Sequence, residues 1–112
     1  MPYLTIDTNA KVKISAEMLE DAVSLVAETL GKPKSYVIVK INSNKDLIAG
    51  ETIDNVGALI EMKSIGFGDK KAELARKLTD FAVQRFGAEG RYVGIHFLDM
   101  PANDVAHNGM LF

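Results

Sequence analysis

The chain of 112 residues is long enough for one domain, and its hydrophobic fraction of 47% is typical of a globular protein. A net charge of −2 argues against a nucleic-acid-binding surface, and the absence of cysteine excludes disulfides, thiol catalysis and zinc sites built on cysteine. No apolar run approaches the roughly 18 residues of a membrane span and no signal-peptide core is present, so we expect a soluble cytoplasmic protein with neither membrane nor nucleic-acid partners.

The first expected element is a strand over residues 3–6, where aromatic and β-branched side chains dominate. Pro2 can open this strand because it has no N–H to give to a ladder. If Met1 is removed, the Pro2 nitrogen becomes a secondary amine, and an α-amino group titrates near about 8. Apolar burial or a nearby cation would lower that pKa. Pro2 is therefore either an ordinary strand-opening residue or a base usable at neutral pH.

A helix is expected after the first strand. Ser15 is a suitable N-cap, Gly31 a suitable C-terminal residue, and Pro33 prevents the helix from continuing. The apolar residues between them recur at helical spacing, namely Leu19, Ala22, Val23, Val26 and Leu30. The next run, over residues 36–41, is apolar at nearly every position, which predicts a buried interior strand.

Residues 42–56 contain turn signals and predict a linker, after which the pattern repeats. Residues 58–65 predict a strand, Asp69 is the expected cap of a second helix, and Gly87 is expected to end it. Residues 92–98 predict the fourth strand. The tail is polar and irregular, but its apolar ending at residues 110–112 is expected to pack against the domain.

An internal repeat organises the whole chain. When the sequence is shifted by half its length, apolar positions coincide throughout: Leu30-Gly31 meets Phe86-Gly87, and Tyr36-Val37 meets Tyr92-Val93. Strand–helix–strand crossovers are right-handed and place both helices on one face of a sheet. We therefore expect an α+β fold, with two βαβ units over about residues 2–56 and 57–112 that form a four-stranded mixed sheet. The uncovered face is expected to be apolar and to be covered by symmetric oligomerisation.

Several short motifs resemble the macrophage migration inhibitory factor family, within the tautomerase superfamily. They are the opening Met1-Pro2, then Thr8-Asn9, Gly31-Lys32-Pro33 with Tyr36 close behind, Ser64-Ile65-Gly66, and Asp99-Met100 followed by Ala102, Val105, Asn108 and Phe112. Their order and spacing cover essentially the whole chain. The resemblance implies one tautomerase domain over residues 1–112, assembled as a trimer with active sites between subunits.

What the resemblance implies chemically is keto–enol tautomerisation of an α-keto acid such as phenylpyruvate, without a cofactor. The catalytic base falls on Pro2, the carboxylate-binding cation on Lys32, and a backbone N–H donor on Ile65. The apolar pocket residues fall on Tyr36, Val105 and Phe112. These roles suit the reaction, because removing a proton beside a carbonyl requires a base of near-neutral pKa, a cation and a dry pocket.

The sequence also departs from the pattern of mammalian members. Gly94 replaces a tyrosine, His96 an asparagine and His107 a tryptophan of the C-terminal loop, which puts substrate preference in question. The two histidines lack carboxylates at metal-ligand spacing, so no metal site is expected. The alternative function is a non-catalytic, cytokine-like binding or signalling factor with a vestigial pocket, a class whose members leave cells without a signal peptide.

Overall fold

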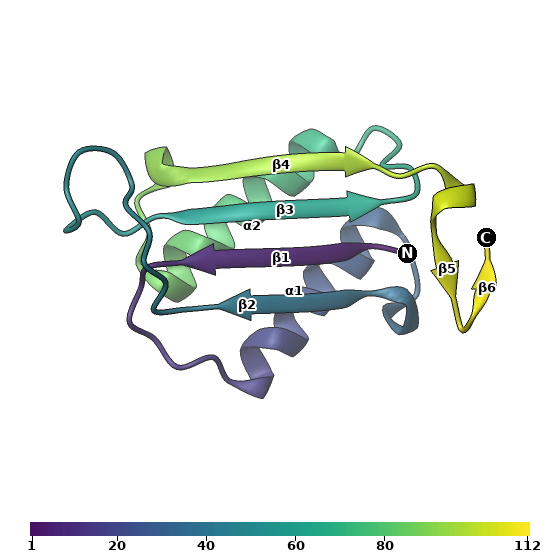
Figure 1. Ribbon diagram of the computed structural model, residues 1–112, viewed down its shortest axis with the longest axis horizontal. Helices are drawn as coiled ribbons and strands as arrows, with labels where there is room; N and C mark the ends of the chain where they lie inside the picture. Colours follow the sequence, from purple (N-terminus) through teal and green to yellow (C-terminus); the bar gives the residue numbers. More distant parts are fainter.

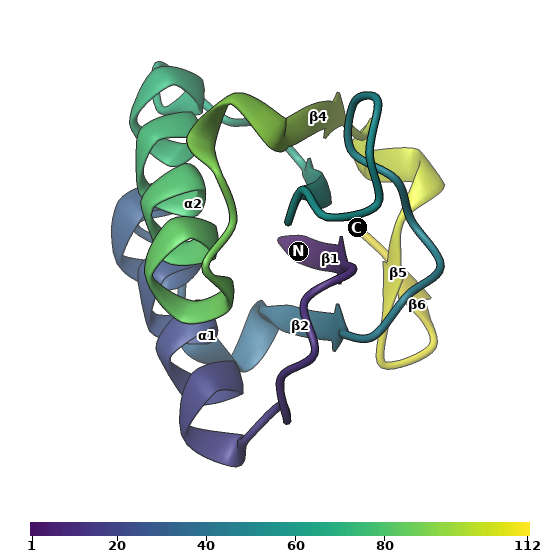
Figure 2. The same cartoon turned by 90° about the vertical axis from the view of Figure 1, so that its left-hand side faces the viewer.

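The computed structural model describes residues 1–112 and forms a four-stranded sheet with two helices packed on one face (Figures 1 and 2). In chain order its main elements are β1 (Tyr3–Thr8), α1 (Ala16–Leu30), β2 (Ile38–Asn42), β3 (Ala58–Ser64), α2 (Lys71–Phe86) and β4 (Val93–Asp99). Short 3-10 turns η1 (Lys34–Tyr36), η2 (Gly90–Tyr92) and η3 (Ala102–Asp104) and a hairpin of β5 (Ala106–His107) and β6 (Met110–Leu111) complete it. Neither helix has the length and apolar character that crossing a bilayer requires.

The sheet order β2-β1-β3-β4 confirms the mixed sheet of two βαβ units. Within each unit the strands are parallel, β1 with β2 and β3 with β4, and the two units meet where β1 pairs antiparallel with β3. Even the small turns repeat, because η1 and η2 lie 56 residues apart and each leads into the second strand of its unit. The repeat read from the sequence therefore corresponds to a repeat of structure.

Helix α1 begins and ends where its sequence predicts. The Ser15 hydroxyl accepts a hydrogen bond from the Met18 backbone N–H at 3.1 Å, which satisfies one free donor of the first turn. Gly31 ends the helix with φ +66°, a conformation that costs glycine little. Helix α2 differs from the prediction, because Lys70 and not Asp69 occupies its N-cap position and makes no side-chain cap. The chain reverses at Gly66 and Gly68 before the helix, which leaves Asp69 outside the capping position.

The core lies between the helices and the sheet. Its central, fully buried side chains alternate along the strands and follow the inner faces of the helices: Leu4, Ile6, Ile60, Met62, Val26, Leu74 and Leu78. Burial of these side chains holds β1 and β3 in place at the middle of the sheet. The start of β1, next to Pro2, is therefore fixed to a rigid layer.

The predicted interior strand at residues 36–41 is an edge strand, so that prediction is wrong in two respects. Tyr36 belongs to the turn η1, and β2 begins at Ile38. Of the residues of β2 only Ile41 is buried, while Ile38 is 59% exposed. Apolar residues on both faces suggested burial, but β2 has a neighbour on one side alone.

The uncovered face of the sheet is mixed and more polar than expected, although Ile38, Leu59 and Leu98 remain exposed on it. Cross-strand pairing aligns Lys40, Thr5, Glu61 and His96 in one row, and Asn42, Asp7, Leu59 and Gly94 in the next. A third row, nearest the start of β1, holds Ile38, Tyr3, Lys63 and Leu98. The apolar runs suggested an apolar outer face, but alternate residues of a strand face opposite sides of the sheet. Most of the apolar residues therefore pack on the helices, and the charged residues lie outside.

The C-terminal hairpin lies beyond the end of the sheet where β1 begins, and it projects on the side away from the helices (Figures 1 and 2). Its apolar ending does not pack into the domain, because Met110 is 75% and Leu111 70% exposed. The expected packing of residues 110–112 is therefore wrong for the single chain, apart from the ring of Phe112.

Candidate functional site

The candidate site lies at the first residues of the chain. Pro2 is fully buried, and its carbonyl oxygen accepts a hydrogen bond from the Ile38 N–H at 3.1 Å, which fixes the start of β1 against β2. Met1 is only 7% exposed, so the N-terminus is held inside the fold and does not extend into solvent. A reactive amine placed here would occupy a defined position on a rigid strand.

Lys32 reaches from the end of α1 to the end of β3. Its ammonium nitrogen lies 2.8 Å from the carbonyl oxygen of Ile65 and 3.1 Å from the Ser64 hydroxyl. The helix C-terminus sets this position, because the Lys32 backbone N–H donates to the Ala27 carbonyl at 3.0 Å across the left-handed Gly31. The structure thus brings Lys32 and Ile65 together, through the carbonyl oxygen of Ile65 and not through the N–H that was predicted as a donor.

The pKa of the N-terminal amine is lowered from its usual value near 8.0. Burial is the larger cause, because desolvation disfavours the charged form, and the positive charge of Lys32 is the second. These are the two influences that a neutral-pH base at this position needs. The amine is that of Met1 in this chain, and it sits next to the Pro2 nitrogen.

The loop after β3 is fixed by the end of β4. The Gly66 N–H donates to the Asp99 carboxylate at 2.9 Å, and the Met100 N–H donates to the Ser64 carbonyl at 2.8 Å. A cavity of about 320 Å³ adjoins this loop and is lined by Leu30, Lys32, Ile65, Gly66, Phe67, Gly68, Asp69 and Lys70. Lys32 therefore borders a space large enough for a small organic acid.

Aromatic side chains gather beside this end of the sheet. The Tyr36 ring meets the rings of His107 and Phe112 edge-on, with centroid distances of 5.1 and 6.4 Å, and His107 lies 6.2 Å from Phe112. The Phe112 N–H donates to the carbonyl of the buried Val105 at 3.0 Å, which holds the chain end in place. Tyr36, Val105 and Phe112, the predicted pocket residues, thus form one cluster, and His107 joins them.

Gly94 and His96 do not join the site of their own chain. They pair with Leu59 and Glu61 on the uncovered face of the sheet, in the rows farther from the start of β1. No group of three His, Asp or Glu side chains is arranged to hold a metal ion. If either residue acts at a site of this kind, the site belongs to another copy of the chain.

The sequence analysis assigned no role to three residues that contribute to the site. Ser64 contacts the Lys32 ammonium, Asp99 holds the loop, and Met1 covers the first strand. The signal for Ser64 was present, since it continues the inward-facing series of Ile60 and Met62 as its one hydroxyl-bearing member. Asp99 and Met1 carry no comparable signal, because their contacts depend on the way β4 and β1 end.

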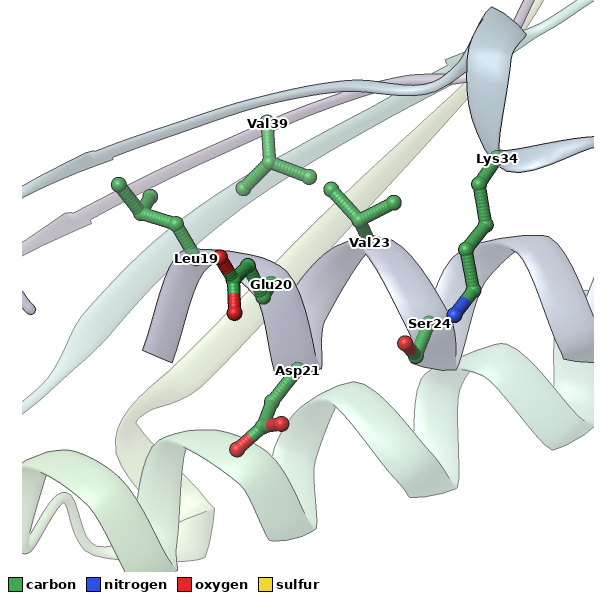
Figure 3. Close-up of a pocket in the computed structure, with 7 residues that line it drawn as sticks. All are labelled: Leu19, Glu20, Asp21, Val23, Ser24, Lys34 and Val39. Carbon is green, nitrogen blue, oxygen red and sulfur yellow. The ribbon is translucent and has the colours of Figure 1, made fainter. Parts of the chain in front are cut away.

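A larger hollow, of about 460 Å³, lies between α1 and β2 (Figure 3). Leu19 and Val23 of α1 lie opposite Val39 of β2, and the Lys34 side chain extends from η1 toward Ser24 (Figure 3). The nearby Asp21 is paired with Arg85 at 2.6 Å, which ties α1 to α2. The hollow is lined by neither Lys32 nor the first residues of the chain, so volume and chemistry indicate different places, and the chemistry favours the start of β1.

Comparison with known proteins identifies one family over the whole chain. The family profile described as macrophage migration inhibitory factor (MIF) matches residues 1–112. A macrophage migration inhibitory factor homolog of Trichuris trichiura is 35% identical over 115 residues, covering all of both chains. The solved structure of the macrophage migration inhibitory factor from Trichinella spiralis superposes with a TM-score of 0.89 at 31% identity, covering 98% of this chain and 99% of the other. The structure of a homologue from Prochlorococcus marinus gives 0.87 at 26% identity, with 98% of each chain covered.

Proposed function

This chain belongs to the macrophage migration inhibitory factor family, and on that premise we propose that it is a cofactor-independent keto–enol tautomerase of α-keto acids such as phenylpyruvate. The observation that carries the proposal is the N-terminal amine, whose pKa is lowered by burial and by the charge of Lys32. An amine whose pKa is lowered and which is fixed near a cation suits proton abstraction next to a carbonyl.

The proposed base is the nitrogen of Pro2 after removal of Met1. Its lone pair takes a proton from the carbon adjacent to the keto group, and the electrons of that C–H bond form the C=C bond of the enol. The carbonyl oxygen takes a proton from solvent water, and the protonated amine then releases its proton to the solvent, which restores the free base. The reverse sequence regenerates the ketone and the free amine. Neither direction needs an oxidant, a metal or a cofactor.

Lys32 is proposed to bind the carboxylate of the substrate. Its ammonium group has three N–H donors, of which the Ile65 carbonyl and the Ser64 hydroxyl take two. One donor remains for the substrate, and a backbone N–H of Ile65 is proposed to assist it. A charge-assisted hydrogen bond of this kind is among the stronger polar contacts.

The aromatic cluster is proposed to bind the remainder of the substrate. Tyr36 and Phe112 present ring surfaces beside Val105, so an aromatic keto acid gains more from this wall than a small aliphatic one. His107 gives the same wall a polar member.

Assembly as a homotrimer is part of the proposal. The family resemblance implies sites between subunits, and Gly94 and His96 reach no site in their own chain. The uncovered sheet face, with Lys40 and Glu61 in one row, is proposed to face the other subunits. Native mass spectrometry should give three times the 12.2 kDa of one chain, and a monomer would contradict shared sites.

The test of the function is the rate of phenylpyruvate ketonisation by protein whose intact mass shows that Met1 is absent. We expect a clear rate above buffer, and a loss on the order of 100-fold in the Pro2→Ala variant, the scale of general base catalysis. The matched control is Pro101→Ala, which changes an exposed proline before η3 and should leave the rate unchanged. A wild-type rate equal to the buffer reaction would overturn the proposal in favour of a binding role.

A further inference from the structure

We propose that Ser64 is a positioning residue, whose buried hydroxyl aims the Lys32 ammonium at the substrate carboxylate and holds its charge near the N-terminal amine. This inference rests on the proposed tautomerase function and extends it to a residue outside the expected set. It starts from the contact of 3.1 Å between the Ser64 hydroxyl and the Lys32 ammonium nitrogen.

The Ser64 hydroxyl is buried, so its hydrogen bond to Lys32 matters for the fold and for the position of Lys32. Ser64 is 0% exposed and follows Ile60 and Met62 on the helix-facing side of β3. A hydroxyl at such a position is costly unless it is hydrogen-bonded, and no buried polar side-chain atom of the chain lacks a partner. The bond to Lys32 is the one side-chain hydrogen bond that Ser64 makes.

Two anchors on Lys32 constrain it more than one would. The Ile65 carbonyl, at 2.8 Å, fixes one N–H and still allows the ammonium group to rotate about that bond. The Ser64 hydroxyl adds a second fixed point, so the direction of the third N–H is defined. Lysine side chains are flexible, and ordering one before the substrate arrives reduces the entropy lost on binding.

The same anchor affects the base. The charge of Lys32 is one cause of the lowered pKa of the N-terminal amine, and this influence falls with distance. A Lys32 that swings away from β3 leaves the amine with burial as its main perturbation. Loss of the Ser64 hydroxyl should therefore raise the pKa of the amine as well as weaken substrate binding.

The experiment compares Ser64→Ala with the wild type, both free of Met1. We expect the KM for phenylpyruvate to rise about fivefold, the effect of one lost hydrogen bond, while kcat changes less than about twofold. The acidic limb of the pH profile of kcat/KM should move to higher pH. Ser64→Thr, which keeps a hydroxyl, should restore both values toward the wild type.

Thr8→Val is the matched control for loss of a buried hydroxyl. Thr8 is also 0% exposed, and its hydroxyl lies 2.7 Å from the Gly57 carbonyl at the opposite end of β1. This variant should lose stability without a change in KM or pH profile. Ser64→Ala with an unchanged KM and an unmoved acidic limb would reduce Ser64 to a core contact and overturn the inference.

A measurement that does not depend on catalysis can test the role of Ser64 separately from the proposed tautomerase activity. The pKa of the N-terminal amine can be measured by NMR titration in the wild type and in Ser64→Ala. A rise in the variant supports the positioning role even if the protein proves inactive toward keto acids, in which case the proposed function alone fails. An equal pKa in both proteins contradicts the inference whatever the activity.

Discussion

The ammonium nitrogen of Lys32 lies 2.8 Å from the carbonyl oxygen of Ile65, although 33 residues separate them in the sequence. This contact joins the end of α1 to the end of β3 and places a positive charge beside the first residues of β1. The chemistry proposed for the chain depends on that charge in two ways, through the carboxylate of the substrate and through the pKa of the amine.

The Lys32→Ala variant should lose its binding of the substrate carboxylate. A hydrogen bond to a charged group contributes about 2 kcal/mol, so kcat/KM for phenylpyruvate should fall roughly 30-fold, mainly through KM. Lys34→Ala is the control, because Lys34 is exposed on η1 and borders the other hollow. Steady-state kinetics on both variants check the prediction, and equal behaviour of the two would contradict it.

The pH dependence of the reaction should show a base whose pKa is below the usual value near 8.0. The neutral amine is the active form, so kcat/KM should rise with pH through that lowered pKa and level off above it. Lys32→Ala removes the second cause of the shift and leaves burial, so the rise should move part of the way back toward 8.0. A rise centred at or above pH 8 in the wild type would argue against this environment.

The same shift links stability to pH. Between the lowered pKa and the usual value, the unfolded chain binds more protons than the folded chain, so the free energy of unfolding increases with pH in this window.

Phe112→Ala should discriminate between substrates. It removes a ring that meets Tyr36 at 6.4 Å and His107 at 6.2 Å, and aromatic pairs contribute about 1 kcal/mol, or roughly fivefold in an equilibrium. The KM for phenylpyruvate should increase by about this factor, while the KM for pyruvate should change little. Met110→Ala, in the same hairpin but 75% exposed, should affect neither substrate. Equal increases for both substrates would indicate a general disturbance of the hairpin.

Gly94→Tyr tests whether sites are shared between subunits. A Cβ atom at Gly94 would meet Leu59 at 3.8 Å, an ordinary contact, so the variant should fold with stability within about 0.5 kcal/mol of the wild type. A phenol added at a neighbouring site should raise kcat/KM several-fold, about the effect of one hydrogen bond. Gly90→Tyr, at an exposed position on η2, is the control. No change in a folded trimer of Gly94→Tyr would argue against a role at the site.

Asn9→Ala should lower stability and spare the chemistry. The Asn9 amide donates to the carbonyls of Asn55 at 2.8 Å and Leu47 at 3.2 Å, and accepts from the Gly57 N–H at 3.0 Å. These bonds fix the linker between the two halves, and losing them should cost about 2 kcal/mol of unfolding free energy. Urea denaturation measures the loss, with the exposed Gln84→Ala as control. Asn9 follows β1 at the end opposite the site, so kcat/KM should stay unchanged.

The fold was predictable from sequence because local signals and the repeat agree. Ser15 and Gly31 bound α1 by backbone chemistry that needs no tertiary context. The strand predicted over residues 58–65 also agrees with β3, which ends one residue earlier, at Ser64. Two copies of one βαβ pattern then leave few ways to build the sheet.

The failures concern position within the sheet and contacts between distant segments. Apolar periodicity does not show which strand lies at an edge, so β2 was misplaced in the interior, and the charged members of the outer rows were overlooked. The site followed from family resemblance and not from spacing, because Lys32 and Ile65 meet only once α1 packs beside β3. Ser64 was treated as part of a motif, since no sequence rule specifies what a buried hydroxyl bonds to.

The burial of Met1 has a consequence for how the molecule would mature. A methionine aminopeptidase needs a free chain end, yet only 7% of Met1 is exposed once β1 is in the sheet. We therefore expect trimming to take place before the chain folds. Each folded molecule would then keep the N-terminus it had when it folded, either Pro2 with a free amine or a retained Met1 that blocks the Pro2 nitrogen. The ratio of the two forms would depend on the rate of Met1 removal relative to the rate of folding.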